Sequence, residues 1–275
     1  MEQKLPALLV FDIDRTLRGD GQPKLGKKTT AAFMHAHETG IRLGIASGRP
    51  LWQGVKEHAF EWDLGFQFDF LIGLNGAELL DTATDEIRHF HYLSPETMKE
   101  IVAKMNPIND IPLIYREGYE LTRVVNDLMA DGARRHNTPI FAYESEDELY
   151  SEPTAKILYR FESAEACLEA EEKALGFCTE EYTCFRTSPI ILEFQSPKIN
   201  KGAALKAYCE ANGIDLNKTI AFGDAENDRE MLMTAGKGIA VQNAQDDVKA
   251  VADLVLDERC DEDAVGIYLN QTYQL

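Results

Sequence analysis

One stretch decides how this chain folds: Ala7-Leu8-Leu9-Val10-Phe11-Asp12-Ile13-Asp14-Arg15-Thr16-Leu17. Five apolar residues in a row are typical of a strand that is buried on both faces. Two aspartates, separated by one residue, follow at its end. Desolvated like charges repel, so this arrangement needs a cation nearby, or one carboxylate that attacks while the other moves a proton. Taken alone, the stretch leaves a simpler alternative open, a polar turn that caps the next segment.

Composition narrows the class of protein. The 275 residues suffice for one large domain or two ordinary ones, with 44% hydrophobic and 27% charged residues, as in soluble globular proteins. The net charge of −19 repels nucleic acid and anionic membranes, so we expect neither as a partner. A small anionic substrate fits if cations gather locally. No apolar run approaches the roughly 20 residues that span a bilayer.

The expected location is the cytoplasm. The first residues lack the basic and apolar pattern of a signal peptide. The five cysteines contain no Cys-x-x-Cys pair, which favours free thiols in a reducing compartment over a disulfide frame or a zinc site. The sequence does not indicate the oligomeric state.

The two ends of the chain alternate strands with helices, which predicts a parallel sheet with helices on both faces. In the first 75 residues we expect strands at 7–11, 41–46 and 69–73, a helix capped by Thr29 or Thr30 that ends near Glu38, and a helix from Pro50 to about Phe60. Near the other end we expect helices at 200–212, 226–235, 246–252 and 261–268, and strands at 218–222, 238–241 and 254–256.

The middle of the chain has a different pattern, with mixed strands and few helices. A hairpin is expected from 77–80 and 86–93, followed by a helix with Ser94 as its cap and Pro95 in its first turn, which ends before Pro107. Further strands are expected at 111–116, 118–124, 155–161, 182–187 and 190–195, and helices at 127–136 and 164–175. We therefore predict a doubly wound α/β core, residues 1–82 and 196–275, with an inserted α+β domain at 83–195.

Polar residues suited to phosphate chemistry lie at four expected strand ends or helix starts. They are Asp12 with Asp14, Ser47, Asp224 with Asn227 and Asp228, and Lys201. In an open parallel sheet, ligands gather at the carboxyl ends of the strands, so these side chains are expected to converge. One short motif is weak evidence, whereas four in this order are strong evidence.

These motifs resemble those of the haloacid dehalogenase (HAD) superfamily. The matching segments are Phe11-Asp12-Ile13-Asp14-Arg15-Thr16-Leu17, Ala46-Ser47-Gly48-Arg49, Asn200-Lys201-Gly202 and Phe222-Gly223-Asp224-Ala225-Glu226-Asn227-Asp228. The segment Asn75-Gly76-Ala77, together with the large insert, resembles the Cof-type sugar-phosphatase branch of this superfamily. The resemblance covers the core and the position of the insert, which would be a cap domain.

The resemblance implies Mg²⁺-dependent hydrolysis of a small phosphomonoester, such as a sugar phosphate or a phosphorylated cofactor. Asp12 would attack phosphorus and form an aspartyl-phosphate, and Asp14 would act as the general acid and base. Mg²⁺ would be held by the Asp12 carboxylate, the Asp14 backbone carbonyl and Asp224, with Asp228 orienting the metal shell or Lys201.

The resemblance also implies a phosphate-binding set. Ser47 would donate a hydrogen bond to a phosphoryl oxygen, Lys201 would pair with the phosphate and with Asp12, and Asn227 would contact the phosphate or support the site. Further possible substrate contacts are Arg15, Gly48, Arg49 and Asn75, with Arg49 being either a salt-bridged structural residue or a contact at the rim.

One residue departs from the family pattern. Arg15 stands where the family usually has glycine, and it could point to solvent or lie over the phosphate. Two alternatives to a phosphatase are a phosphomutase of the same fold and a non-catalytic regulator that binds a phosphometabolite.

Overall fold

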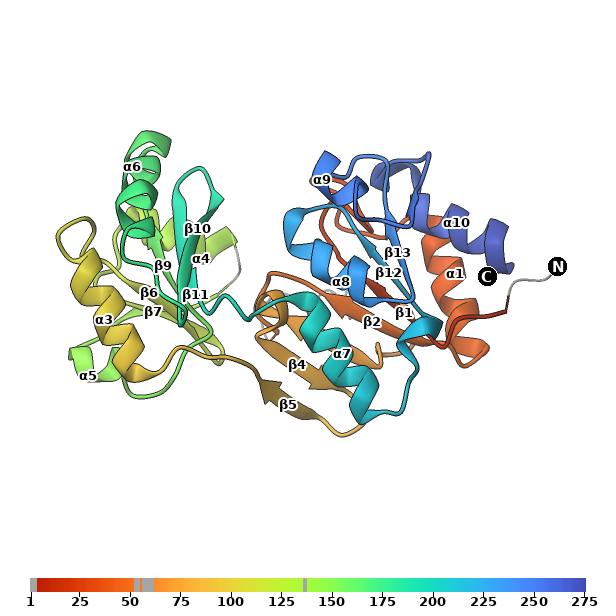
Figure 1. The fold of residues 1–275 in the computed structure, drawn as a ribbon, viewed down its shortest axis with the longest axis horizontal. Helices are drawn as coiled ribbons and strands as arrows, with labels where there is room; N and C mark the ends of the chain where they lie inside the picture. The colour runs from red at the N-terminus through yellow and green to blue at the C-terminus, as the bar shows by residue number, and fades with distance from the viewer. Residues whose placement is uncertain (1–3, 52–54, 56–61, 136–137) are drawn as a thin grey trace. The chain divides into compact units, whose positions relative to one another are not determined.

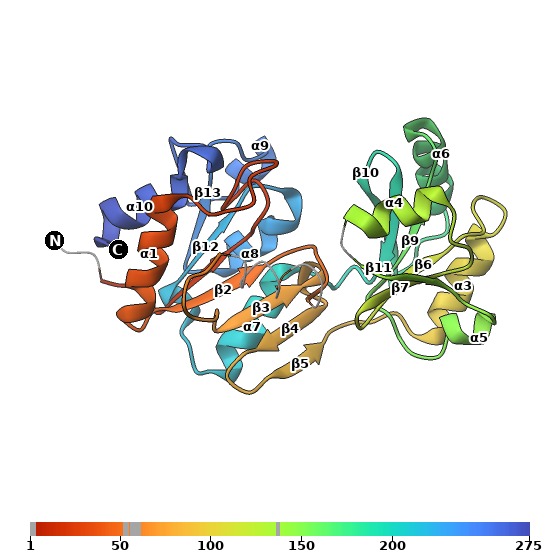
Figure 2. The same cartoon turned by 180° about the vertical axis from the view of Figure 1, so that it is seen from behind.

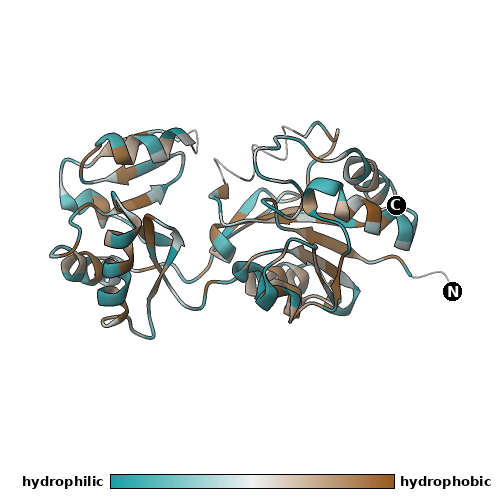
Figure 3. Cartoon of the chain, turned by 90° about the horizontal axis from the view of Figure 1, so that it is seen from above, coloured by the Kyte–Doolittle hydropathy of each residue, from teal (hydrophilic) through white to brown (hydrophobic). Residues whose placement is uncertain are grey.

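A computed structural model describes residues 4–51, 55, 62–135 and 138–275. The chain forms two compact units: a core unit of Met1–His89 with Asn200–Leu275, and an insert unit of Phe90–Ile199. Each unit has its own β-sheet. Figure 3 shows apolar residues along the strands of each unit and many polar residues on the helices.

The core unit is built on an eight-stranded sheet in the order β14-β13-β12-β1-β2-β3-β4-β5 (Figure 1). The six strands from β14 to β3 run parallel, and β4 and β5 are antiparallel additions at one edge. The strands are β1 Leu8–Phe11, β2 Arg42–Ala46, β3 Phe70–Gly73, β4 Glu78–Asp81, β5 Glu86–His89, β12 Thr219–Gly223, β13 Lys237–Ala240 and β14 Leu254–Val255.

Strand β1 lies at the centre because its sequence can be buried on both faces. All four of its residues are fully buried, and Leu8 pairs with Thr219 of β12 on one side and with Arg42 of β2 on the other. Phe11 contacts the rings of Phe33 and Phe222. The apolar run therefore produces the strand that was expected from it.

Two pairs of helices cover the sheet of the core unit. Helices α1 and α10 lie on one face, and α7 and α8 lie on the other (Figures 1 and 2). The bounds of these four helices are α1 Lys27–Glu38, α7 Lys201–Ala211, α8 Arg229–Thr234 and α10 Ala264–Tyr273. A shorter helix, α9, spans Asp246–Lys249. This is the predicted doubly wound α/β core.

The insert unit has a six-stranded sheet in the order β10-β11-β9-β6-β7-β8. Its strands are β6 Leu113–Arg116, β7 Tyr119–Thr122, β8 Ile140–Ala142, β9 Lys156–Arg160, β10 Thr183–Ser188 and β11 Ile191–Gln195, and its helices are α3 Pro95–Met105, α4 Asp127–Arg135, α5 Glu146–Leu149 and α6 Ala164–Leu175. Residues of α3 and α6 form an apolar core with one face of this sheet.

The other face of the insert sheet carries charged side chains. Lys156 pairs with Glu193 at 3.0 Å, and Arg160 pairs with Glu120 at 3.3 Å, and all four side chains are buried. Buried charges stay ionised only when they are paired, so each pair depends on both of its members.

Several expectations need correction. The hairpin β4–β5 pairs with β3, so it belongs to the core unit, and the division falls after His89 and after Ile199 instead of near residues 82 and 196. Strand β8 and helix α5 were not expected, because both are very short. Helix α10 begins at Ala264 and runs to Tyr273, beyond the expected 261–268. Most of the helix expected from Pro50 to Phe60 lies outside the described residues.

The expected cap of α1 was also wrong. Its N-cap residue is Gly26, which has no side chain to offer. The Asp263 carboxylate, from the other end of the chain, accepts hydrogen bonds from the backbone N–H groups of Lys28 and Thr29, at 2.8 and 3.0 Å. A tertiary contact therefore satisfies donors that a neighbouring side chain was expected to satisfy.

Candidate active site

Strand β1 delivers Asp12 to the carboxyl end of the sheet, where it meets Lys201 at the first position of helix α7. The Lys201 ammonium donates to Asp12 Oδ1 at 2.7 Å and to Asp228 Oδ1 at 2.6 Å. The lysine is fully buried, and Asp12 is nearly so. An ammonium at a helix N-terminus is disfavoured by the helix dipole, so the two carboxylates must hold it there.

Two more carboxylates follow strand β12. Asp228, in the 3₁₀ turn Glu226–Asp228, accepts hydrogen bonds through Oδ2 from the backbone N–H groups of Asp224 and Ala225, at 3.0 and 3.1 Å. Gly223 is required at the turn, because a Cβ atom there would lie 2.4 Å from the Cβ of Asp228. The Asp228 carboxylate thus bridges its own loop and Lys201.

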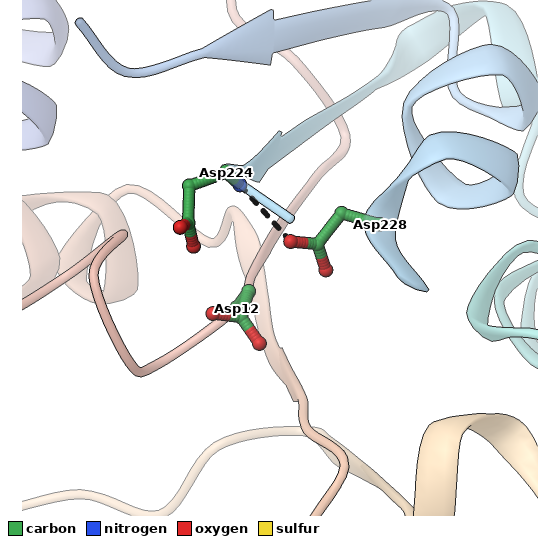
Figure 4. A group of neighbouring side chains, drawn as sticks. All are labelled: Asp12, Asp224 and Asp228. Atoms are coloured by element: carbon green, nitrogen blue, oxygen red, sulfur yellow. Dashed lines mark hydrogen bonds between the residues drawn. The ribbon is translucent and has the colours of Figure 1, made fainter. Parts of the chain in front are cut away.

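The carboxylates of Asp12, Asp224 and Asp228 converge, as Figure 4 shows. Each offers an oxygen, and the three oxygens lie within 4.8 Å of one another. Asp224 Oδ1 accepts a hydrogen bond from Thr16 at 3.0 Å, whereas its Oδ2 is buried and, within the described part of the chain, has no hydrogen-bond partner. A buried oxygen of this kind is costly unless it binds a cation. The all-oxygen donor set fits Mg²⁺, with Asp12 and Asp224 having the most suitable oxygens.

Burial and mutual repulsion perturb the ionisation of this cluster. Burial raises the pKa of Asp12, against the lowering effect of Lys201. Burial, and then the Asp228 charge, raise the pKa of Asp224 to about 6. Burial opposes the charge on Lys201, but Asp12 and Asp228 outweigh it and raise the pKa of the lysine. Lys201 is therefore a permanent cation inside the cluster.

The Asp14 side chain is 46% exposed, in contrast to the buried carboxylates of the cluster. The Arg49 guanidinium grips its carboxylate in a fork, donating from Nε and from one terminal nitrogen at 2.9 Å each. Arg18 adds a further contact at 3.3 Å. Arg49 is thus salt-bridged to another predicted site residue, and its contact with a substrate stays a prediction.

Four further predicted residues, Ser47, Gly48, Asn75 and Asn227, follow strands β2, β3 and β12. Ser47 is buried, and its Oγ accepts from the Arg49 backbone N–H at 3.2 Å. Asn227 Nδ2 donates to Asn75 Oδ1 at 2.9 Å, and a Cβ atom on Gly48 would lie 2.9 Å from that same oxygen. The structure thus brings the ends of β2, β3 and β12 to one place.

A model of the haloacid dehalogenase-like hydrolase family matches residues 9–269. The chain belongs to the haloacid dehalogenase-like hydrolases. It is an enzyme of that family, and the resemblance of its motifs is confirmed.

Several relatives of this hydrolase are named phosphatases. The HMP-PP phosphatase of Cronobacter sakazakii is 29% identical over 94% of this chain and 93% of its own. The phosphoglycolate phosphatase of Methanopyrus kandleri is 28% identical, over 92% and 91% of the two chains. A 5-amino-6-(5-phospho-D-ribitylamino)uracil phosphatase of Bacillus subtilis is 26% identical, over 93% and 91%.

Solved structures share the fold of this hydrolase. A haloacid dehalogenase-like hydrolase from Bacteroides thetaiotaomicron superposes with a TM-score of 0.85 at 26% identity, covering 98% of this chain and 99% of that one. A HAD subclass IIB sugar phosphatase has a TM-score of 0.75 at 23% identity, with 96% and 98% covered. Among the described residues of the hydrolase, no helix combines the length and apolar character needed to cross a bilayer.

Three residues of this hydrolase joined the site without being predicted as site residues. Thr16 holds Asp224, Arg18 holds Asp14, and Asn243 donates to the backbone carbonyl of Arg15 at 2.8 Å. Thr16 lies within the first motif and Arg18 directly follows it, so their proximity to Asp12 and Asp14 in the sequence was a signal. Asn243 has no such signal, because only the fold brings it across from beyond β13.

Proposed function

We propose that this hydrolase cleaves small phosphomonoesters with Mg²⁺, through an aspartyl-phosphate on Asp12. The observation that supports it best is the buried cluster in which Lys201 bridges Asp12 and Asp228, beside Asp224 Oδ2, a buried oxygen that accepts no hydrogen bond from the described residues. A carboxylate attacks a phosphate dianion poorly unless positive charge screens the approach. This cluster provides one fixed cation and oxygen ligands for another.

The chain's own residues account for each transfer. The Asp12 oxygen that is not held by Lys201 attacks phosphorus, and the bond from phosphorus to the ester oxygen breaks. Asp14 gives its proton to the leaving alcohol and then takes one from the water that attacks the aspartyl-phosphate. Hydrolysis regenerates Asp12 and releases phosphate. Arg49 positions the ionised form of Asp14, which is the base of the second step, through its fork.

Mg²⁺ would be held by the Asp12 carboxylate, the Asp14 backbone carbonyl and Asp224, and would neutralise charge on the phosphoryl oxygens. Asp228 uses one oxygen for Lys201 and the other for two backbone N–H groups. We therefore assign Asp228 to the positioning of Lys201. Ser47 and Asn227 would hold the phosphate, with Asn75 and Gly48 shaping the wall beside them.

The substrate is proposed as a small phosphorylated metabolite. The named relatives act on chemically different molecules, yet their identities to this chain lie between 26% and 29%, so identity favours none of them. We propose that the insert unit supplies the selectivity. A screen of purified protein against sugar phosphates, phosphoglycolate and phosphorylated cofactors would identify the class.

The decisive experiment compares the wild type with Asp12→Asn on p-nitrophenyl phosphate. We expect Mg²⁺-dependent release of p-nitrophenol by the wild type, and loss of at least about a thousandfold in the variant, because an amide is not a nucleophile. An unchanged circular dichroism spectrum would show that the fold is intact. Equal activity in the two proteins would disprove the assignment of Asp12.

Two further measurements separate the alternatives, a competition between water and an added sugar phosphate and a calorimetric titration. A phosphomutase would pass the phosphoryl group to an added sugar phosphate faster than to water. A regulator would bind a sugar phosphate in a calorimeter without turning it over.

A further inference from the structure

Arg15 adopts a backbone conformation that is costly for any residue except glycine. Its φ is 65°, in the left-handed region, where a side chain costs about 1 to 2 kcal/mol. The backbone is held there from both sides: the Arg15 N–H donates to Arg18 O at 2.8 Å, and Arg15 O accepts from Asn243 Nδ2 at 2.8 Å. The direction in which the Arg15 Cα–Cβ bond leaves the backbone is thus set by the fold.

This direction takes the guanidinium toward the carboxylate cluster. Arg15 Nε lies 3.8 Å from Asp224 Oδ2, the buried oxygen proposed as a metal ligand. That distance is too long for a hydrogen bond, but it is well within the range of Coulomb attraction. The arginine side chain is 48% exposed, so water screens its charge, whereas Asp224 is 2% exposed.

The other cations at the site are engaged with other carboxylates. Lys201 contacts Asp12 and Asp228, and Arg49 and Arg18 contact Asp14. The charge on Arg15 therefore acts mainly on Asp224. It belongs to this chain in particular, since the first motif of the resembling family usually has glycine at this position.

We propose that Arg15 is an internal counter-cation of Asp224, which weakens binding of Mg²⁺ and strengthens binding of the phosphoryl anion at the same site. The inference rests on the proposed function. A fixed positive charge repels a divalent cation that shares its carboxylate, and it attracts an anion placed next to that cation. Coulomb's law gives the size of the effect. In a medium that screens like water, a unit positive charge about 6 Å from a divalent cation weakens the binding of that cation about tenfold. Arg15 would thus raise the Mg²⁺ concentration that is needed to occupy the metal site.

Calorimetry on four proteins tests whether Arg15 has opposite effects on the affinities for Mg²⁺ and for phosphate. Mg²⁺ is titrated into the wild type, Arg15→Gln, Arg15→Lys and Arg134→Gln, and inorganic phosphate is then titrated at saturating Mg²⁺. We expect Arg15→Gln to bind Mg²⁺ about tenfold more tightly and phosphate several-fold more weakly. Arg15→Lys keeps the charge and should stay near the wild type. Arg134, on an exposed part of helix α4, is the control for loss of an arginine charge elsewhere.

The two signs distinguish this role from a structural one. A variant whose site is merely distorted would bind both ligands more weakly. Unchanged or weaker Mg²⁺ binding by Arg15→Gln, or tighter phosphate binding, would overturn the proposal. Because no turnover is measured, the outcome is independent of the Asp12 assignment: a protein that gives the expected opposition but does not hydrolyse p-nitrophenyl phosphate would contradict the proposed function alone.

Discussion

Gly76 lies against the backbone of the residue that caps helix α7. Its φ is +106°, and a Cβ atom there would lie 2.2 Å from the carbonyl oxygen of Asn200 and 3.0 Å from the Lys201 nitrogen. Asn200 caps α7 by accepting from the Ala203 N–H at 2.7 Å. The position of Lys201, and with it the geometry at Asp12, therefore depends on the absence of a side chain at residue 76.

Gly76→Ala should consequently damage both stability and the site. We expect a loss of about 2 kcal/mol or more from backbone strain and the clash, and a fall in kcat of at least about tenfold as Lys201 shifts. Urea unfolding and the p-nitrophenyl phosphate assay measure the two effects.

The matched control is Gly213→Ala. Gly213 also has a positive φ, +64°, but nothing lies within 4 Å of the Cβ position. This variant should lose about 1 kcal/mol and keep its kcat. If Gly76→Ala kept its kcat as well, the position of Lys201 would not depend on Gly76.

Helix α1 shows how an element can depend on the far end of the chain. Its first N–H groups are capped by Asp263, just before helix α10, and a Cβ atom on Gly26 would lie 2.2 Å from the carboxylate carbon of Asp263. The two helices also pack closely, because a Cβ atom on Gly266 would lie 2.2 Å from the Thr29 nitrogen. Helices α1 and α10 are thus held together by the Asp263 cap, and Gly26 and Gly266 allow the close approach of their backbones.

We expect Asp263→Ala to lower the free energy of unfolding by about 1 to 2 kcal/mol, the usual value of an N-cap. Asp263→Asn, which keeps an acceptor oxygen, should lose less. Urea denaturation of the two variants measures the difference. Equal losses would mean that the hydrogen bonds to Lys28 and Thr29 contribute little.

Helix α7 also carries Tyr208, whose tertiary contacts make the stability of the protein depend on pH. Tyr208 stacks on Phe70 of strand β3, with ring centroids 4.0 Å apart, and its hydroxyl accepts from Arg42 at 3.1 Å. Burial raises the pKa of Tyr208 to about 12, against the lowering effect of Arg42. In the unfolded chain a tyrosine titrates near pH 10.

A raised folded-state pKa gives stability that is fully present below about pH 10 and is lost as the pH rises toward about 12. Tyr208→Phe keeps the ring stack and removes the titrating group. At pH 7 it should be less stable by about 1 kcal/mol, the value of a lost hydrogen bond. The deficit should shrink between pH 10 and 12 in denaturant titrations. A deficit that stays constant would show that Tyr208 titrates normally.

The molecule as a whole consists of two units, each with its own sheet and buried interior. The insert unit contains its apolar core and both members of each buried ion pair, Lys156 with Glu193 and Arg160 with Glu120. All these stabilising contacts lie within residues 90–199, a length at which many domains fold alone.

We therefore expect an excised fragment of residues 90–199 to fold cooperatively. Its thermal unfolding, followed by near-ultraviolet circular dichroism, should be a single transition. Arg160→Met removes the guanidinium that pairs with the buried Glu120 carboxylate, so it should cost about 3 to 5 kcal/mol in the fragment and in the full chain alike. A fragment without tertiary signal, or a different cost in the two contexts, would show that the insert depends on the core.

The sequence by itself predicted the parallel strands of the core and most residues of the candidate site, but not Thr16, Arg18 or Asn243. A strand buried on both faces needs an unbroken apolar run, and Leu8–Phe11 shows one; parallel strands place their ends at one edge, so Asp12, Ser47 and Asp224 were predicted to meet. Local signals of this kind depend on neighbours along the chain. Helices α3 and α6, which begin at serine caps, were placed correctly for the same reason.

Only the tertiary structure decided the features that depend on distant contacts. The hairpin of β4 and β5 could have belonged to either unit until its pairing with β3 placed it in the core. The cap of α1 came from Asp263, 234 positions from Thr29, which no local pattern could indicate. The direction of Arg15 was likewise undetermined, because it follows from a backbone held by Asn243 across the fold. Hydrogen bonds and charges act through space, whereas sequence patterns report only the periodicity of neighbours.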